Sequence, residues 1–133
     1  MRNLYTNTVS SELWDTLLSL MKMEELLPFR LVGGTALSLQ LGHRVSVDID
    51  LFTDAAYESV DFQVMDKLFQ SHFPFVETIF WENTGFGKAY YIGNSRKNMI
   101  KVDMFYTDAF IRPAIEVDTI RMASIEDITA MKM

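Results

Sequence analysis

Apolar residues near the start of the chain recur at the spacing of an amphipathic helix. Leu13, Leu17 and Leu20 are three or four positions apart, which places them on one side of a helix. Ser10 stands just before this run, where its side chain would cap the first turn. The pattern therefore predicts a packing helix that begins near Ser10 and is stopped by Pro28.

The next segment predicts a strand, a sharp turn and a short helix. Residues 29–32 are mainly apolar and run into Gly33-Gly34, a pair that permits a tight change of direction. Thr35 then stands where it would cap the short helix.

Between residues 45 and 52 the pattern changes to strict alternation. Apolar side chains occupy one set of alternate positions and polar side chains the other, namely Val45, Val47, Ile49 and Leu51 against Ser46, Asp48 and Asp50. Because side chains alternate between the two faces of a strand, both aspartates must point to the same side.

The rest of the chain predicts further elements around one sheet. We expect a helix at about 60–73, strands at 75–81, 88–92, 98–106 and 116–122, turns at 85–87 and 93–95, and a final helix capped by Ser124 and Asp127. No repeat or linker divides the sequence, so a single domain over residues 1–133 is expected. The order of elements indicates an α+β fold, with a mixed or antiparallel sheet covered by helices mainly on one face.

Composition narrows the chemistry. The chain has no cysteine, so any metal must be held by oxygen or imidazole ligands, which favours a hard cation. The formal net charge of −6 is the wrong sign for gripping nucleic acid by bulk electrostatics. The only candidate patch for nucleic acid is formed by Lys88, Arg96, Lys97 and Lys101, and the alternative is a hairpin with a solvated charged turn. No apolar run approaches the about 18 residues of a membrane span, and a cytoplasmic location is the default expectation.

The pair Asp48 and Asp50 is the most informative motif. On one face of a strand their Cα atoms lie about 6.6 Å apart, at a rise of about 3.3 Å per residue, so both carboxylates can converge on one cation. Without a cation they repel, and burial would raise the pKa of at least one. The alternative is the solvated face of an edge strand. The apolar residues around the pair favour a central strand, where solvation alone does not explain two acids on one face.

A third carboxylate could complete this site. Asp103 lies on a later predicted strand, between Val102 and Met104, and could face the first two acids. Three carboxylates from adjacent strands suit a pair of Mg²⁺ ions that bridge phosphate oxygens. The alternative for Asp103 is a surface acid paired with Lys101. An EF-hand calcium loop is excluded, because Leu51 and Phe52 stand where oxygen ligands would be required.

Residues before the acids could bind phosphate. Gly33, Gly34 and Thr35 at a strand-to-helix turn offer backbone N–H groups and a helix N-terminus, which together attract anions. If the strand begins early, Arg44 and Ser46 share the face of the aspartates, so that Arg44 could touch a triphosphate and Ser46 could orient a carboxylate. Either residue could equally have a structural role.

Four blocks of the sequence resemble the nucleotidyltransferases of the AbiEii/AbiGii toxin family, within the polymerase-β-like superfamily. They are residues 31–37, 43–52, 101–105 and 123–132, and the resemblance covers roughly residues 30 to 133. The first two blocks are the most specific, since they combine the glycine turn with both acids. The resemblance implies a nucleotidyltransferase fold and transfer of a nucleoside monophosphate from an NTP to an acceptor hydroxyl, with Mg²⁺ or Mn²⁺ required and pyrophosphate released.

The resemblance also implies partners and roles. Some relatives are toxins that modify tRNA beside a separately encoded antitoxin, so tRNA or another RNA is the expected acceptor and a cognate antitoxin the expected partner. By role, the implied residues are Asp48 and Asp50 for both metals, Asp103 for the catalytic metal and the acceptor hydroxyl, Gly33, Gly34 and Thr35 for the triphosphate, and Lys132 for the nucleotide or acceptor.

The sequence departs from the family at its end. Relatives continue past the lysine at Lys132 into a helical C-terminal half, whereas this sequence stops one residue later, and we expect that half to be lacking. Two other readings stay open: a minimal nucleotidyltransferase that modifies a partner protein, and a non-catalytic interaction domain that keeps the fold.

Overall fold

Seven strands form one mixed sheet in the computed structural model, which describes residues 4–42, 48–79 and 87–131. In chain order the elements are η1 (Thr6–Thr8), α1 (Ser11–Met21), η2 (Glu24–Leu26), β1 (Arg30–Val32), α2 (Gly33–Leu41), β2 (Asp48–Thr53), α3 (Phe62–His72), β3 (Phe75–Thr78), β4 (Gly87–Ser95), β5 (Asn98–Tyr106), β6 (Ile115–Val117), β7 (Ile120–Met122) and α4 (Ile125–Met131). The strand order across the sheet is β3-β4-β5-β2-β1-β7-β6. The α+β fold predicted from the sequence is therefore confirmed.

The centre of the sheet is a parallel pair. β2 runs parallel to β5 and β1 runs parallel to β7, while the other neighbouring strands are antiparallel. β2 lies between β5 and β1 and is therefore an interior strand. Its aspartates do not lie on a sheet edge, so the alternative of a solvated edge strand is wrong.

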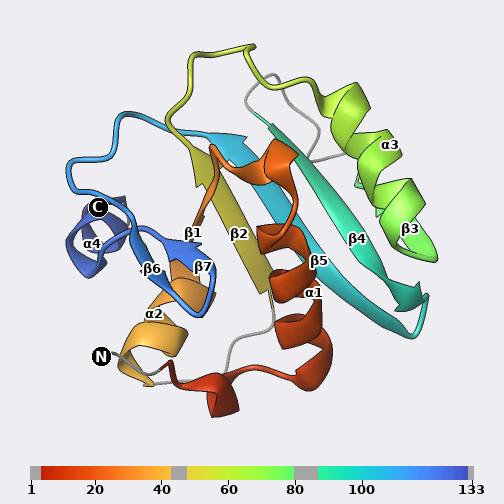
Figure 1. Ribbon diagram of the computed structural model, residues 1–133, viewed down its shortest axis with the longest axis horizontal. Helices are drawn as coiled ribbons and strands as arrows, with labels where there is room; N and C mark the ends of the chain where they lie inside the picture. Colours follow the sequence, from red (N-terminus) through yellow and green to blue (C-terminus); the bar gives the residue numbers. More distant parts are fainter. Residues whose placement is uncertain (1–3, 43–47, 80–86, 132–133) are drawn as a thin grey trace.

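The two faces of β2 have different surroundings. Ile49 and Leu51 are fully buried, whereas Asp48, Asp50 and Phe52 are half-buried. We call the side of the sheet that carries the acids the carboxylate face and the opposite side the helical face. Helix α1 lies across the helical face (Figure 1). Its buried leucines form part of the core there, and burial of each stabilises the fold by about 1.5–3 kcal/mol.

Helix α3 also packs on the helical face. Its Asp66 accepts hydrogen bonds from Lys88 Nζ at 2.7 Å and from the Tyr90 hydroxyl at 2.6 Å, and its Phe69 meets the Tyr90 ring edge-on at 5.0 Å. Helices α2 and α4 lie near each other, beside β1 and β7 (Figure 1). None of the described helices has the length and apolar character needed to cross a membrane.

The first helix is shorter than predicted. Ser10 caps it as expected, since its Oγ accepts the Leu13 N–H at 3.1 Å, but α1 ends at Met21 rather than at Pro28. The guanidinium of Arg121 donates to the carbonyls of Met21 and Leu26 at 3.1 and 3.0 Å. These long-range bonds stabilise a folded-back segment that local sequence does not reveal.

The predictions of one strand and one turn also need correction. The strand expected at 116–122 is a hairpin of β6 and β7, turning at Asp118 and Thr119, which have φ values of 52° and 69°. Left-handed residues of this kind make tight hairpins, but glycine usually occupies such positions and none does here. The turn expected at 93–95 instead belongs to β4.

Candidate active site

The register of the parallel pair brings the predicted acids together. Asp50 on β2 lies directly beside Asp103 on β5, and Asp48 lies beside Lys101. Alternation places all four side chains on the carboxylate face. The sequence predicted that Asp103 could face the Asp48 and Asp50 pair, and the strand pairing gives it this position.

Burial and the neighbouring acids perturb the pKa of Asp50. Burial, a hydrogen bond with Asp103 and the negative charges of Asp103 and Asp48 raise the pKa of Asp50 to about 7, and the Lys101 ammonium opposes this rise. Lys101 Nζ lies 3.7 Å from Asp103 Oδ1. A raised pKa on a carboxyl beside a second carboxyl is a pattern common at functional sites.

The donor set fits a divalent cation. Within the described ranges, no three acidic or imidazole side chains converge closely enough to form a ready metal cage. Asp50 and Asp103 share a hydrogen bond instead, as two adjacent carboxyls do when a proton separates them. Their oxygens and those of Asp48 are the hard donors that Mg²⁺ and Mn²⁺ prefer, and a cation would relieve the repulsion that raises the Asp50 pKa.

The glycine turn lies against these acids. Gly33 has a φ of 72°, and a Cβ there would overlap Asp50 Oδ2. Both facts require glycine, because another residue would be strained in the left-handed region and would displace the carboxylate. The phosphate turn and the acids, predicted separately, therefore form one continuous surface.

Thr35 has a different local role from the one predicted. Helix α2 begins at Gly33 and its cap is Val32, which contributes no side-chain bond. Thr35 is buried within the first turn, and its hydroxyl donates to the Asp48 carbonyl. The prediction that Thr35 caps the helix is wrong, and the observed bond ties the start of α2 to the strand that carries the acids.

Three predicted site residues cannot be placed. Arg44, Ser46 and Lys132 lie outside the described residues.

The basic residues of the candidate nucleic-acid patch are divided between the two faces of the sheet by strand alternation. Lys101 is on the carboxylate face, whereas Lys88 is on the helical face and pairs with Asp66 at 2.7 Å. These residues therefore do not make one nucleic-acid patch.

A hollow beside the acids was missed by sequence reasoning. It has a volume of about 380 Å³, and we call it the Phe52 hollow; its lining residues are Phe52, Thr107, Asp108, Ala109, Phe110, Ile111 and Asp127. Phe52 belongs to the carboxylate face two positions after Asp50. Most of the other lining residues come from the loop between β5 and β6, which has no regular hydrophobic pattern that could have revealed it.

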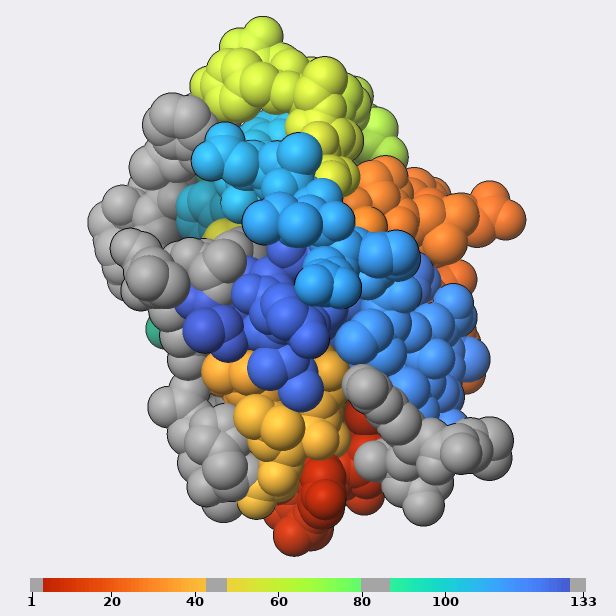
Figure 2. All heavy atoms as spheres, turned by 90° about the vertical axis from the view of Figure 1, so that its left-hand side faces the viewer, coloured from red at the N-terminus to blue at the C-terminus, as the bar shows by residue number. Residues whose placement is uncertain are grey.

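Helix α4 positions this loop. Both carboxylate oxygens of the buried Asp127 accept backbone N–H groups at 3.0 Å, from Ile111 and Arg112. Figure 2 shows the light-blue atoms of the loop beside the deep-blue atoms of α4. Burial acts to raise the pKa of Asp127, but the bonds from Arg112, Ile111 and Ser124 and the charge of Arg30 outweigh it and lower the pKa. The predicted capping pair is confirmed, since Ser124 Oγ accepts the Asp127 N–H at 3.1 Å.

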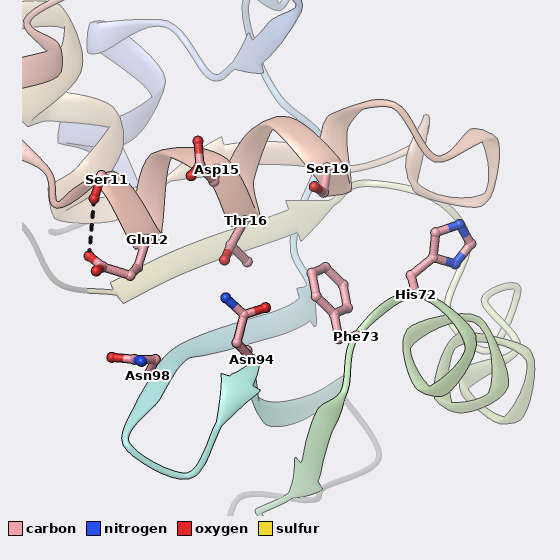
Figure 3. Close-up of a pocket in the computed structure, with 10 residues that line it drawn as sticks. Ser11, Glu12, Asp15, Thr16, Ser19, His72, Phe73, Asn94 and Asn98 are labelled. Carbon is pink, nitrogen blue, oxygen red and sulfur yellow. Dashed lines mark hydrogen bonds between the residues drawn. The ribbon is translucent and has the colours of Figure 1, made fainter.

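A separate polar hollow lies on the helical face. Its volume is about 360 Å³, and it is bounded by α1, the end of α3 and the β4–β5 hairpin (Figure 3). Thr16 on α1 points toward Asn94 across it, and Glu12, Asp15 and Asn98 also line it. Acceptors and donors are mixed here, so the lining does not select one class of ligand, and the sheet separates this hollow from the acids.

Solved structures define the class of the fold. A crystal structure from H. pylori that is described provisionally as a nucleotidyltransferase shares 21% identity with this chain, with a TM-score of 0.59, and the match covers 89% of this chain and 55% of that one. The structure of JHP933 from Helicobacter pylori also shares 21% identity, with a TM-score of 0.60 and coverage of 93% and 57%. The protein therefore has a nucleotidyltransferase fold, and the chain spans a little over half the length of these two structures.

A family model narrows this class. The family described as nucleotidyl transferase AbiEii toxin, type IV TA system, matches residues 16–133. The chain belongs to this AbiEii family, as the sequence resemblance predicted. No curated protein sequence matches it significantly.

Proposed function

We propose that the protein is a metal-dependent nucleotidyltransferase that transfers a nucleoside monophosphate from an NTP to an acceptor hydroxyl, as the toxin of a toxin–antitoxin or phage-defence system. The observation that carries this proposal is the contact of three parts: Asp48 and Asp50 on β2, Asp103 beside Asp50 on β5, and Gly33 against the Asp50 carboxylate. Membership of the AbiEii family supports it.

The glycine turn would hold the triphosphate. Gly33, Gly34 and Thr35 form the first turn of α2, where the positive end of the helix dipole attracts anions. The missing side chain of Gly33 makes room for the Asp50 carboxylate, which brings this turn directly beside an acid of the proposed metal site. From the alternation in the sequence, Arg44 is proposed to touch the triphosphate and Ser46 to orient a carboxylate. Lys132 is proposed, from the family resemblance alone, to contact the nucleotide or the acceptor.

The acids would position the transfer. Asp48, Asp50 and Asp103 are proposed to hold Mg²⁺ or Mn²⁺, which would neutralise charge on the phosphates. The acceptor oxygen forms a bond to the α-phosphorus, the bond from that phosphorus to the bridging oxygen breaks, and pyrophosphate leaves with the electron pair. Asp103 lies beside Asp50 and receives the proton of the acceptor hydroxyl. Lys101, 3.7 Å from Asp103, limits the build-up of negative charge.

The partners follow from the proposed role. We infer an RNA acceptor, with tRNA as one candidate, and a cognate antitoxin encoded separately; a type IV toxin–antitoxin family implies the latter. A cytoplasmic location is proposed because NTPs and RNA are found there.

Labelling with an α-labelled NTP tests the proposal. The protein should label RNA only with Mg²⁺ or Mn²⁺ present, and Asp48→Asn with Asp50→Asn should abolish labelling. Asp15→Asn, an exposed acid on α1, serves as the matched control and should keep full activity. No labelling of RNA, protein or small hydroxyl acceptors by folded protein would overturn the proposal. Calorimetry of NTP binding distinguishes the enzyme from a non-catalytic interaction domain, because only the enzyme should bind an NTP in a metal-dependent way.

A further inference from the structure

We propose that the Phe52 hollow holds the terminal nucleobase of an RNA acceptor and so defines the acceptor side of the site. This inference rests on the proposed nucleotidyl transfer. It adds a location, a ligand class and new residues, namely Phe52, Phe110 and Ile111.

The direction of the reaction gives the first argument. In an in-line displacement the attacking and leaving oxygens lie on opposite sides of the phosphorus. The turn proposed to hold the leaving pyrophosphate lies at the Asp48 end of β2, where Thr35 bonds to the Asp48 carbonyl. The hollow lies at the other end of β2, beyond Asp50, where Phe52 contributes its side chain. If the turn holds the leaving group, the hollow lies on the side of the acids that is left for the acceptor.

The shape and chemistry of the lining give the second argument. Phe52 is held edge-on against Phe105, with ring centroids 6.1 Å apart. The Phe110 ring lies over the Arg30 guanidinium, 4.3 Å from centroid to Cζ. Proteins bind unpaired bases by stacking them on aromatic rings. A hollow of about 380 Å³ is large enough for a single base and too small for a folded RNA element.

The walls are held in place without a ligand. Phe110 N–H donates to Asp54 at 3.1 Å, Ile111 N–H donates to Asp127 at 3.0 Å, and Arg30 donates to the Arg112 carbonyl at 2.8 Å. Despite this anchoring, the Ile111 side chain is 82% exposed. The hydrogen bonds fix the backbone of the wall before a ligand arrives, and the exposed Ile111 side chain is accessible at its rim.

Charge favours a terminal base over a long RNA backbone. Asp108 lines the hollow and Asp54 anchors its wall, and the whole chain carries a formal net charge of −6. Acids would repel a run of phosphates, whereas Asp108 can accept hydrogen bonds from base amino groups or ribose hydroxyls. Each phosphate contact contributes about −0.7 to the slope of log affinity against log salt for single strands. Since no lysine or arginine among the described residues lines the hollow, we expect a shallow dependence of RNA affinity on salt.

Steady-state transfer to a short single-stranded RNA tests the inference. Phe52→Leu keeps apolar volume but removes the ring, and should raise the acceptor KM about tenfold while the NTP KM stays unchanged. Ile111→Ala should change the acceptor KM in the same direction by a smaller factor, and loses little packing because the side chain is exposed. Leu27→Ala, which truncates another exposed side chain (60%) outside the hollow, is the matched control and should have no effect.

Photo-crosslinking separates the two proposals. An RNA ending in 4-thiouridine should crosslink to the peptide that contains Phe110 and Ile111. An unchanged acceptor KM in both variants, an azido-NTP that crosslinks to this peptide, or labelling of protein hydroxyls in place of RNA would each overturn the inference. If the wild-type protein transfers to no acceptor, the proposed function fails, and crosslinking of the RNA elsewhere then overturns the assignment of the hollow as well.

Discussion

Replacing Asp50 with asparagine should stabilise the metal-free protein at neutral pH. The pKa of this carboxyl rises from its ordinary value of 3.8 to about 7 in the folded chain, first because of burial and then because of Asp103 and Asp48. The folded state therefore binds more protons than the unfolded state between these pH values. By linkage, stability falls as pH rises from about 4 to about 7 and then levels off.

The magnitude follows from the size of this rise. At about 1.4 kcal/mol per pH unit, the rise from 3.8 to about 7 sets an upper limit of roughly 4 kcal/mol. Asp50 is only half-buried, so solvent screening reduces the expected cost to about 2 kcal/mol. The neutral amide of Asp50→Asn removes that cost and the repulsion with Asp103.

Urea denaturation in EDTA measures the effect. Between pH 5 and pH 8 the wild-type protein should lose about 1 kcal/mol of unfolding free energy, since this window covers about two thirds of the rise. Asp50→Asn should lose little and be the more stable protein at pH 8. Mg²⁺ should raise the stability of the wild-type protein far more than that of the variant, because binding to the folded state adds stability. Asp15→Asn should behave as the wild-type protein does. A wild-type protein that gains stability over this pH range in EDTA would refute the reasoning.

Other substitutions test neighbouring parts of the site. Gly33→Ala should reduce the transfer rate about 100-fold and lower the unfolding free energy by about 1–3 kcal/mol. The control Gly42→Ala, at a similar φ of 70°, should lose stability but keep its transfer rate per folded molecule. Initial rates and thermal melts check both variants, and equal transfer rates would contradict a role for Gly33. Asp127→Asn should cost about 2 kcal/mol at pH 7. Because the folded pKa of Asp127 is lowered, this difference should shrink as pH falls through that pKa, and urea melts at pH 7 and pH 3 that show a growing difference would refute it. Thr35→Val should cost about 1–2 kcal/mol through the lost bond to Asp48, while Thr35→Ser should retain most stability in the same melts.

Local chemistry made several features of this protein readable from its sequence. Alternation alone places Asp48 and Asp50 on one face of a strand, since the pleat of the backbone forces successive side chains to opposite sides. The caps at Ser10 and Ser124 were likewise predictable, because a cap is a bond between residues two or three positions apart. The family resemblance, carried by short blocks of sequence, correctly gave the fold class.

Long-range pairing decided the rest. No local pattern predicts that Asp50 lies beside Asp103 or that Gly33 packs on the Asp50 carboxylate. Nor does one predict that Arg121 donates a hydrogen bond to the Met21 carbonyl at the end of the first helix. Such contacts depend on which distant apolar surfaces bury each other, and that packing sets the strand register. The sequence alone therefore determined which side chains share a strand face. Only the tertiary structure joined two strands and a turn into one charged site, because the burial that raises the Asp50 pKa exists only when they meet.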